Sequence, residues 1–100
     1  MPYLVRLTSR ALRDLETIYK FIEAETSERA FAWFNELAEK IGSLERFAGR
    51  GSLTPENKKL RQLIFGKKPN THRIIYRLDK RNHVVTVLHI RHGARIALLK

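Results

Sequence analysis

Alternating apolar and polar residues dominate the second half of the chain and limit the folds open to it. Three segments alternate over strand length, and the third contains a run of β-branched residues: 60–65, 72–78 and 83–91. Two turn-forming sequences separate these segments: Gly66-Lys67-Lys68-Pro69-Asn70 and Asp79-Lys80-Arg81-Asn82. We therefore expect three strands connected by two hairpins.

The first half predicts one strand and two helices. Residues 3–8 alternate, whereas two later segments carry apolar residues at spacings of three and four, as one face of a helix does. Ser9 and Ser27 are the expected N-caps, because a serine oxygen accepts hydrogen bonds from the first free amides of a helix. Residues 48–57 have no period and predict the main loop. The apolar helix positions are Leu12, Leu15, Ile18, Tyr19 and Ile22, then Phe34, Leu37, Ile41 and Leu44.

The element order βααβββ predicts an α+β fold in a single domain over residues 1–100. A helical hairpin should pack on one face of a largely antiparallel four-stranded sheet and leave the other face open. The hydrophobic content of 43% is enough for one core in a chain of this length. Tyr76 is expected to face that core, and Trp33 to flank the helical packing.

Composition also indicates in which cellular compartment the protein is expected. The sequence has no cysteine, so a disulfide framework and a thiolate metal site are both excluded. No segment has the apolar length of a secretory signal or of a membrane span. We expect a cytoplasmic protein that does not engage a membrane.

Positive charge is concentrated in one part of the chain. Residues 1–57 hold eight Lys and Arg against nine Asp and Glu, a net charge of −1, whereas residues 58–100 hold twelve against one, a net charge of +11. A solubilising surface usually mixes both signs, whereas a segregated block is typical of a site for nucleic acid or for an acidic protein. The C-terminal half should therefore meet a negatively charged partner.

The candidate site lies on the open face of the predicted sheet. Alternation places Arg73 and Arg77 on the face opposite Ile74 and Tyr76, and Arg61 interrupts the preceding apolar run in the same way. The last strand ends in a basic segment, so we expect convergence near one end of the sheet of Arg61, Arg73, Arg91, His92 and Arg95. Lys58 and Lys59 precede this set and extend its expected nucleic-acid-binding surface.

Such a cluster suits phosphate chemistry without a metal. Guanidinium groups bind phosphate oxygens in a bidentate fork, and an imidazole moves protons near neutral pH. RNA supplies its own 2′-hydroxyl nucleophile, so cleavage needs a base, an acid and cations. His92 or His89 would handle protons, and Arg73 and Arg95 would stabilise charge. For each residue taken alone, phosphate docking without catalysis explains its presence at least as well.

Other site chemistries are disfavoured. His89 and His92 are three residues apart on a strand, which points them to opposite faces and disfavours a shared metal site. No serine, histidine and aspartate stand in a triad context, and no glycine-rich phosphate loop precedes a helix. We expect neither a metal nor another cofactor.

Three segments together resemble the RelE/ParE superfamily of bacterial type II toxins. They are Leu7-Thr8-x-x-Ala11-x-x-Asp14-Leu15, Arg73-Ile74-Ile75-Tyr76-Arg77 and Val87-Leu88-His89-Ile90-Arg91-His92-Gly93-Ala94-Arg95. The resemblance spans nearly the whole chain. It implies a cytosolic toxin that a cognate antitoxin holds inactive in a hetero-oligomer.

The superfamily implies two possible activities. RelE-like members cut messenger RNA in the ribosomal A site, whereas ParE-like members inhibit DNA gyrase without an established nuclease centre. By position, Arg73 and Arg95 match two arginines of the nucleases, and Arg61 matches a basic residue less surely.

Some features of the sequence favour RNA cleavage, and others favour gyrase inhibition. The tyrosine that many of the nucleases carry a few residues beyond the Arg95 position has no counterpart here, although His92 is a possible substitute. The set Arg73, His92 and Arg95 favours RNA cleavage, which we expect by a narrow margin. The long helical hairpin favours gyrase inhibition. A small basic nucleic-acid-binding accessory protein remains a third hypothesis.

Overall fold

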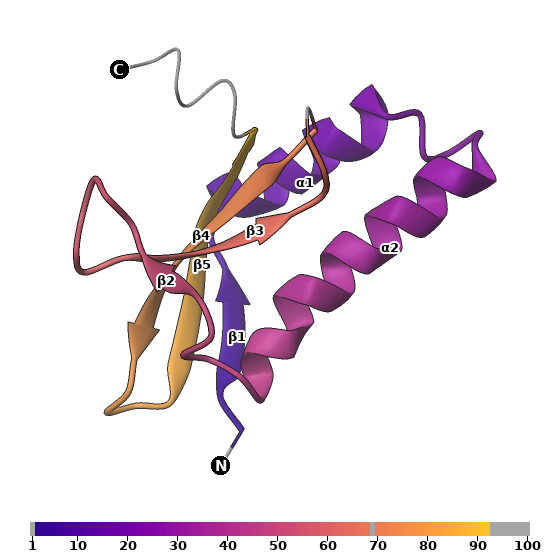
Figure 1. Ribbon diagram of the computed structural model, residues 1–100. Coiled ribbons are helices and arrows are strands. Elements are labelled where there is room, and N and C mark those ends of the chain that lie inside the picture. Colours follow the sequence, from indigo (N-terminus) through magenta and orange to yellow (C-terminus); the bar gives the residue numbers. More distant parts are fainter. Residues whose placement is uncertain (1, 69, 93–100) are drawn as a thin grey trace.

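The computed structural model describes residues 2–68 and 70–92 of the chain. Two helices lie on one side of a sheet, and their hairpin projects beyond it (Figure 1). In chain order the elements are β1 (Leu4–Leu7), α1 (Ser9–Phe21), α2 (Glu28–Gly42), a short 3-10 helix η1 (Ser43–Glu45), β2 (Ser52–Leu53), β3 (Arg61–Phe65), β4 (His72–Asp79) and β5 (Val84–His92). The α+β class and the helical hairpin on one face are therefore confirmed.

Among the residues that the structure describes, the sheet has five strands in the order β1-β5-β4-β3-β2, so the expected number of four is wrong by one. The additional strand, β2, pairs antiparallel with β3 through only two residues, which is too short for a recognisable period in the sequence. β1 runs parallel to β5, whereas β3, β4 and β5 form the two antiparallel pairs expected of consecutive hairpins. The chain between β1 and β5 runs through both helices and strands β2 to β4, which is long enough to allow the parallel pair.

The two helix starts depend on side-chain caps. Ser27 caps α2 as expected, because its Oγ accepts a hydrogen bond from the Ala30 amide at 3.2 Å. For α1 the cap is Thr8 rather than Ser9, and the Thr8 Oγ1 accepts from the Ala11 amide at 3.0 Å. The Thr8 hydroxyl also donates to the Leu88 carbonyl at 2.7 Å. Thr8 thus starts the helix and attaches it to β5 at once.

Beyond the end of β1, Thr8 and helix α1 form hydrogen bonds with the backbone of β5. β1 pairs with residues 84–87 only, and the Thr8 amide donates the last bond of that side to the Val87 carbonyl at 3.0 Å. Farther along β5, the Ile90 amide donates to Asp14 Oδ2 of α1 at 2.9 Å. The helix thereby satisfies backbone groups that an edge strand would leave unpaired.

The core lies between the helices and the sheet. Its largest fully buried side chains are Tyr76, Leu37, Leu44, Ile74, Val85 and Val87. Leu15 and Ile18 of α1 pack against this core, but Leu12 is 56% exposed, so its place in the predicted buried stripe is wrong. Within the described residues, neither helix is long and apolar enough to cross a bilayer.

Tyr76 joins the core to the loop before β2. Its side chain is fully buried, as expected, and its hydroxyl donates to the Ala48 carbonyl at 2.8 Å and accepts from the Gly51 amide at 3.0 Å. Gly51 has no room for a side chain, because an added Cβ would lie 2.6 Å from both the Tyr76 hydroxyl and the Gln62 carbonyl oxygen. A buried hydroxyl therefore fixes the first part of the predicted loop.

We expect Tyr76→Phe to lower the free energy of unfolding by about 2 kcal/mol, because it leaves a buried carbonyl and a buried amide without their partner. Urea denaturation at pH 7 measures this loss. Tyr19→Phe is the matched control, since the Tyr19 ring packs edge-on against Phe34 and the ring is kept. Equal stability of the two variants would contradict the anchoring role of the Tyr76 hydroxyl.

Candidate functional site

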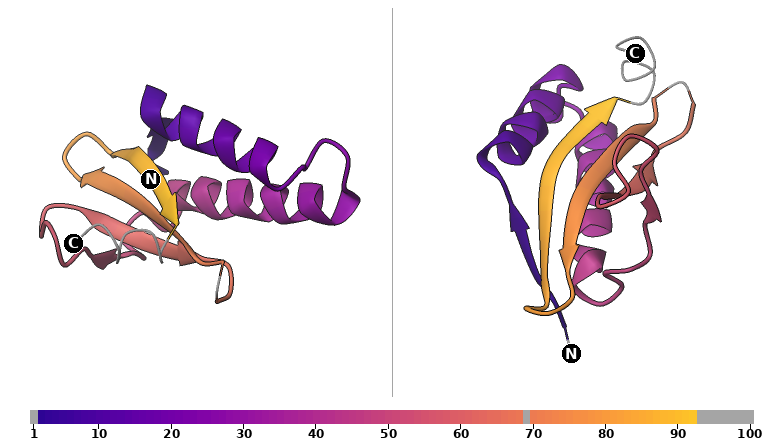
Figure 2. Two further views of the ribbon diagram at one scale, coloured as in Figure 1. Left: turned by 90° about the horizontal axis from the view of Figure 1, so that it is seen from above. Right: turned by 90° about the vertical axis from the view of Figure 1, so that its left-hand side faces the viewer.

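β4 divides the candidate residues between the two faces of the sheet. Side chains alternate along a strand, and directly paired residues of neighbouring strands point to the same face. Ile74 pairs with Ile90, both in the core, so this face lies under the helices and is called the helix face. Arg73 pairs with Arg91 on the opposite face, called the open face. The helices cover one side of the sheet in both views of Figure 2.

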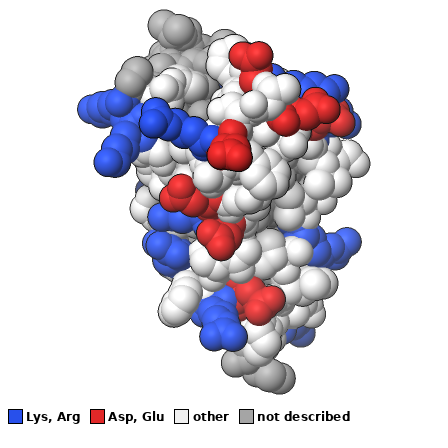
Figure 3. Space-filling view, turned by 90° about the vertical axis from the view of Figure 1, so that its right-hand side faces the viewer, with Lys and Arg blue, Asp and Glu red and all other residues white. Residues whose placement is uncertain are grey.

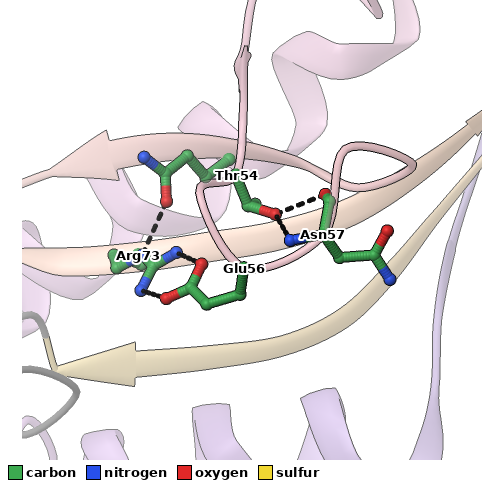
Figure 4. A network of polar contacts seen from close by, with 5 residues as sticks. Thr54, Glu56, Asn57 and Arg73 are labelled. Atoms are coloured by element: carbon green, nitrogen blue, oxygen red, sulfur yellow. Dashed lines mark hydrogen bonds and ion pairs between the residues drawn. The ribbon is translucent and has the colours of Figure 1, made fainter. Parts of the chain in front are cut away.

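Arg73 lies on the open face, as expected, but a loop covers it. Its Nη1 and Nη2 donate to the two carboxylate oxygens of Glu56 at 2.9 and 2.7 Å, and its Nε donates to Gln62 Oε1 at 2.6 Å (Figure 4). The Arg73 side chain is only 10% exposed, against 41% for Glu56. This arrangement is a bidentate fork of the kind that arginine forms with carboxylates, and it neutralises the arginine.

A tight turn holds Glu56 over the sheet. The Thr54 hydroxyl donates to the Asn57 carbonyl at 2.6 Å and accepts from the Asn57 amide at 3.1 Å (Figure 4). Thr54 is buried, and its amide donates to the Leu60 carbonyl at 2.9 Å. A threonine that closes a short loop in this way is common in turns. Sequence reasoning missed Glu56, although the segment Thr-Pro-Glu-Asn carried that turn signal.

His92 lies on the helix face, so its expected convergence with Arg73 is wrong. Its partner across the strands is His72, with ring centroids 5.1 Å apart. Trp33 of α2 stands edge-on to both His72 and Phe65, at 5.5 and 5.1 Å. Burial, and secondarily the charge of His92, lower the pKa of His72. His92 thus belongs to an aromatic cluster under the helices.

Arg61 is also on the helix face, which corrects its expected place beside Arg73. It pairs with the buried Tyr76, and its Nη1 donates to the Gly51 carbonyl at 2.9 Å. Sequence alternation alone cannot relate the faces of two strands, because a shift of one residue in register exchanges them.

The other predicted cations have different surroundings. Arg91 lies beside Arg73, whereas Arg77 is exposed at the far end of β4. Arg77 borders a shallow hollow of about 520 Å³ together with Lys58, Lys59 and Arg61. Two further cations of this hollow were not singled out from the sequence, Lys80 and Arg81. Arg95 lies outside the described residues.

His89 occupies the open face, opposite to His92, as expected from their spacing. It pairs with Ile75 of β4. Burial lowers the pKa of His89, and the charges of Arg10 and Arg91 lower it further. In residues 2–68 and 70–92, no three His, Asp or Glu side chains come together as metal ligands would.

We expect Glu56→Gln to destabilise the protein by about 2 kcal/mol, because it leaves the covered Arg73 without its counter-ion. The value is below the ~3–5 kcal/mol of a fully buried pair, since solvent reaches Glu56. Urea denaturation at pH 7 gives the difference. Glu25→Gln, in an exposed turn, is the control and should change little. Equal effects would exclude a stabilising role for the ion pair.

The stability of the fold should fall below neutral pH because of His72 and His89. Their pKa values are lowered in the folded state, so the unfolded chain binds more protons below the ordinary histidine pKa of 6.5. The contribution is complete above that pKa and is lost as the pH falls towards the folded values. Thermal unfolding between about pH 7 and pH 5 measures the slope. His72→Phe should flatten it, and an unchanged slope would contradict the role of His72.

A family model and a similar protein indicate the same family for this chain. Residues 5–97 match the family model described as the ParE toxin of the type II toxin-antitoxin system parDE. Toxin RelG of Mycobacterium tuberculosis is 30% identical over 96 residues, which are 96% of this chain and 97% of that protein.

Solved structures share the fold. A chromosomal ParDE toxin-antitoxin system from P. aeruginosa has a TM-score of 0.70 at 22% identity, over 90% of this chain and 95% of the matched one. The toxin-antitoxin complex RelBE2 from M. tuberculosis has a TM-score of 0.57 at 28% identity, over 92% and 99%. A mutant of E. coli toxin RelE in the free state has a TM-score of 0.66 at 12% identity, over 99% and 92%. The sequence match over nearly the whole chain, together with this fold, places the chain in the ParE toxin family of type II toxin-antitoxin systems, within the RelE/ParE superfamily.

Proposed function

We propose that this chain is a cytoplasmic growth-arresting toxin that acts by binding DNA gyrase, as ParE-like toxins do, rather than by cutting RNA. A cognate antitoxin would hold it inactive in a hetero-oligomer. Similarity to chains of the ParDE system and of the RelBE2 complex supports that partner.

The separation of Arg73 from His92 carries the choice of mechanism. A general acid or base must come within hydrogen-bond reach of the reacting group, either directly or through one water. Arg73 and His92 project from opposite faces of the same sheet, and the Arg73 guanidinium is bound on three nitrogens by Glu56 and Gln62. The described residues therefore lack the assembled phosphate site on which the expectation of RNA cleavage depended.

A second candidate function is ribosome-dependent cleavage of messenger RNA. It is favoured by one observation, the side-by-side placement of Arg73 and Arg91 on the open face. Displacement of Glu56 by a phosphate would expose two adjacent guanidinium groups. In that case ribosome and messenger RNA would be the partners, and the proton-handling group would have to come from the open face, where His89 lies.

Two measurements during induced expression separate these functions. We expect growth arrest with intact transcript ends and with loss of negative supercoiling from a reporter plasmid, because the target is the gyrase. Cuts in translated messages at a fixed codon phase would overturn the gyrase proposal. If expression causes no growth arrest, there is nothing for a neighbouring antitoxin gene to relieve. That result would instead favour the accessory-protein hypothesis.

A matched pair of variants sharpens the result. Arg91→Gln should leave RNA intact and supercoiling reduced if gyrase is the target, but should abolish cleavage if the second candidate holds. Arg13→Gln, on the exposed side of α1, removes one charge away from the open face and is the control. Circular dichroism confirms that both variants fold.

A further inference from the structure

The basic hollow lies where β4 extends past β3. β3 begins opposite Tyr76, so Arg77 and the two residues after it have no β3 partner. This step in the sheet is bordered by the loop before β3 and by the turn between β4 and β5. Its cations are Lys58, Lys59, Arg61, Arg77, Lys80 and Arg81. The hollow is therefore at the end of β4 opposite to His72 and His92.

Within the described part of the chain, no acidic partner neutralises the cations of the hollow. No cation of the hollow forms a salt bridge within residues 2–68 and 70–92, in contrast to Arg73. Asp79 is the single acidic residue of the lining, and its carboxylate accepts from the Asn82 amide and side chain at 3.0 and 2.9 Å. These hydrogen bonds lower the pKa of Asp79, which stays ionised but offsets only one of the six charges. The face shown in Figure 3 differs from the hollow, because acidic and basic side chains are interspersed on it.

Arg61 gives the hollow a fixed donor. Its Nη1 is held by the Gly51 carbonyl at 2.9 Å, a neutral acceptor that orients the guanidinium without cancelling its charge. The remaining five cations are exposed. Like charges repel when they are gathered in this way, so the cluster lowers its energy when an extended anion occupies it.

We propose that this hollow binds the sugar-phosphate backbone of a nucleic-acid duplex. The lining contains cations and the apolar side chains Leu53 and Leu78, but no aromatic ring on which an unpaired base would stack. Backbone contacts by lysine and arginine fix position and carry no sequence information. The site therefore reads phosphate spacing rather than sequence. It goes beyond the proposed function, since it holds whether the toxin's target is gyrase or the ribosome.

The test is the affinity of the purified full chain for a fluorescein-labelled 20-base-pair DNA duplex, by fluorescence anisotropy across a salt series. The triple variant Arg77→Gln, Lys80→Gln, Arg81→Gln should bind at least tenfold more weakly at low salt. The slope of log K against log salt should fall by about three, because each phosphate contact contributes about 0.9. The control triple Arg13→Gln, Lys20→Gln, Arg29→Gln removes equal charge from exposed helix positions and should bind like the parent.

Each outcome decides the proposal. Equal weakening by both triple variants would mean attraction by net charge alone and would overturn it. Tighter binding of a single strand than of the duplex, or binding of an acidic peptide but not of the duplex, would overturn it as well. Equal binding of DNA and RNA duplexes of different sequence would support backbone recognition. If the hollow triple variant fails to fold by circular dichroism, Lys80→Gln in the exposed turn should still reduce the slope by about one.

Discussion

The alternation of side chains along β4 is the constraint on which the rest of the structure depends. β4 is the middle strand of the sheet, between β5 and β3. Its helix face supplies Ile74 and Tyr76 to the core, and Tyr76 reaches through to fix the loop at Gly51. Its open face carries Arg73 and Arg77. One strand therefore determines both what is buried and which cations face solvent.

The two arginines that β4 places on the open face have different surroundings, and this difference bears on function. Arg73 is covered by a loop and neutralised by Glu56, so it contributes to the fold as an ion pair. Arg77 stands at the end where β3 no longer accompanies β4, and its charge joins five others around an open hollow. Six cations thus gather around one hollow, and none of them forms a salt bridge within residues 2–68 and 70–92. A site of bare cations suits binding, whereas a nuclease requires its proton-handling group within reach of its cations.

The sequence predicted the class of fold because its periods are local. Strand and helix patterns depend on neighbours two to four residues apart. The bounds of β3, β4 and β5 were therefore predicted closely, and the presence of both helices was predicted as well. What failed depended on distant partners. Thr8 replaces Ser9 as the cap because Leu88, far along the chain, accepts its hydroxyl, and β2 exists only as a two-residue pairing with β3.

The candidate site was harder to predict for the same reason. Within one strand, alternation shows which residues share a face. It therefore correctly placed Arg73 and Tyr76 on different faces, and His89 and His92 on different faces. Which residues of two neighbouring strands share a face depends on the pairing register, which the sequence does not show. Arg61 and His92 were therefore assigned to the wrong face. Glu56 lies in a loop without a period, and nothing local shows that it reaches Arg73 across seventeen residues.

The separation of His92 from Arg73 by the sheet is tested most directly by the position of the His92 ring in solution. Proton nuclear Overhauser spectra of the folded chain measure whether its ring protons approach those of His72 and, through His72, the indole of Trp33 under α2. Because His92 lies on the helix face, we expect cross-peaks between His92 and His72 and between His72 and Trp33, with none from His92 to the side chain of Arg73. Cross-peaks from His92 to Arg73 would place both on one face and would contradict the separation on which the proposed mechanism rests.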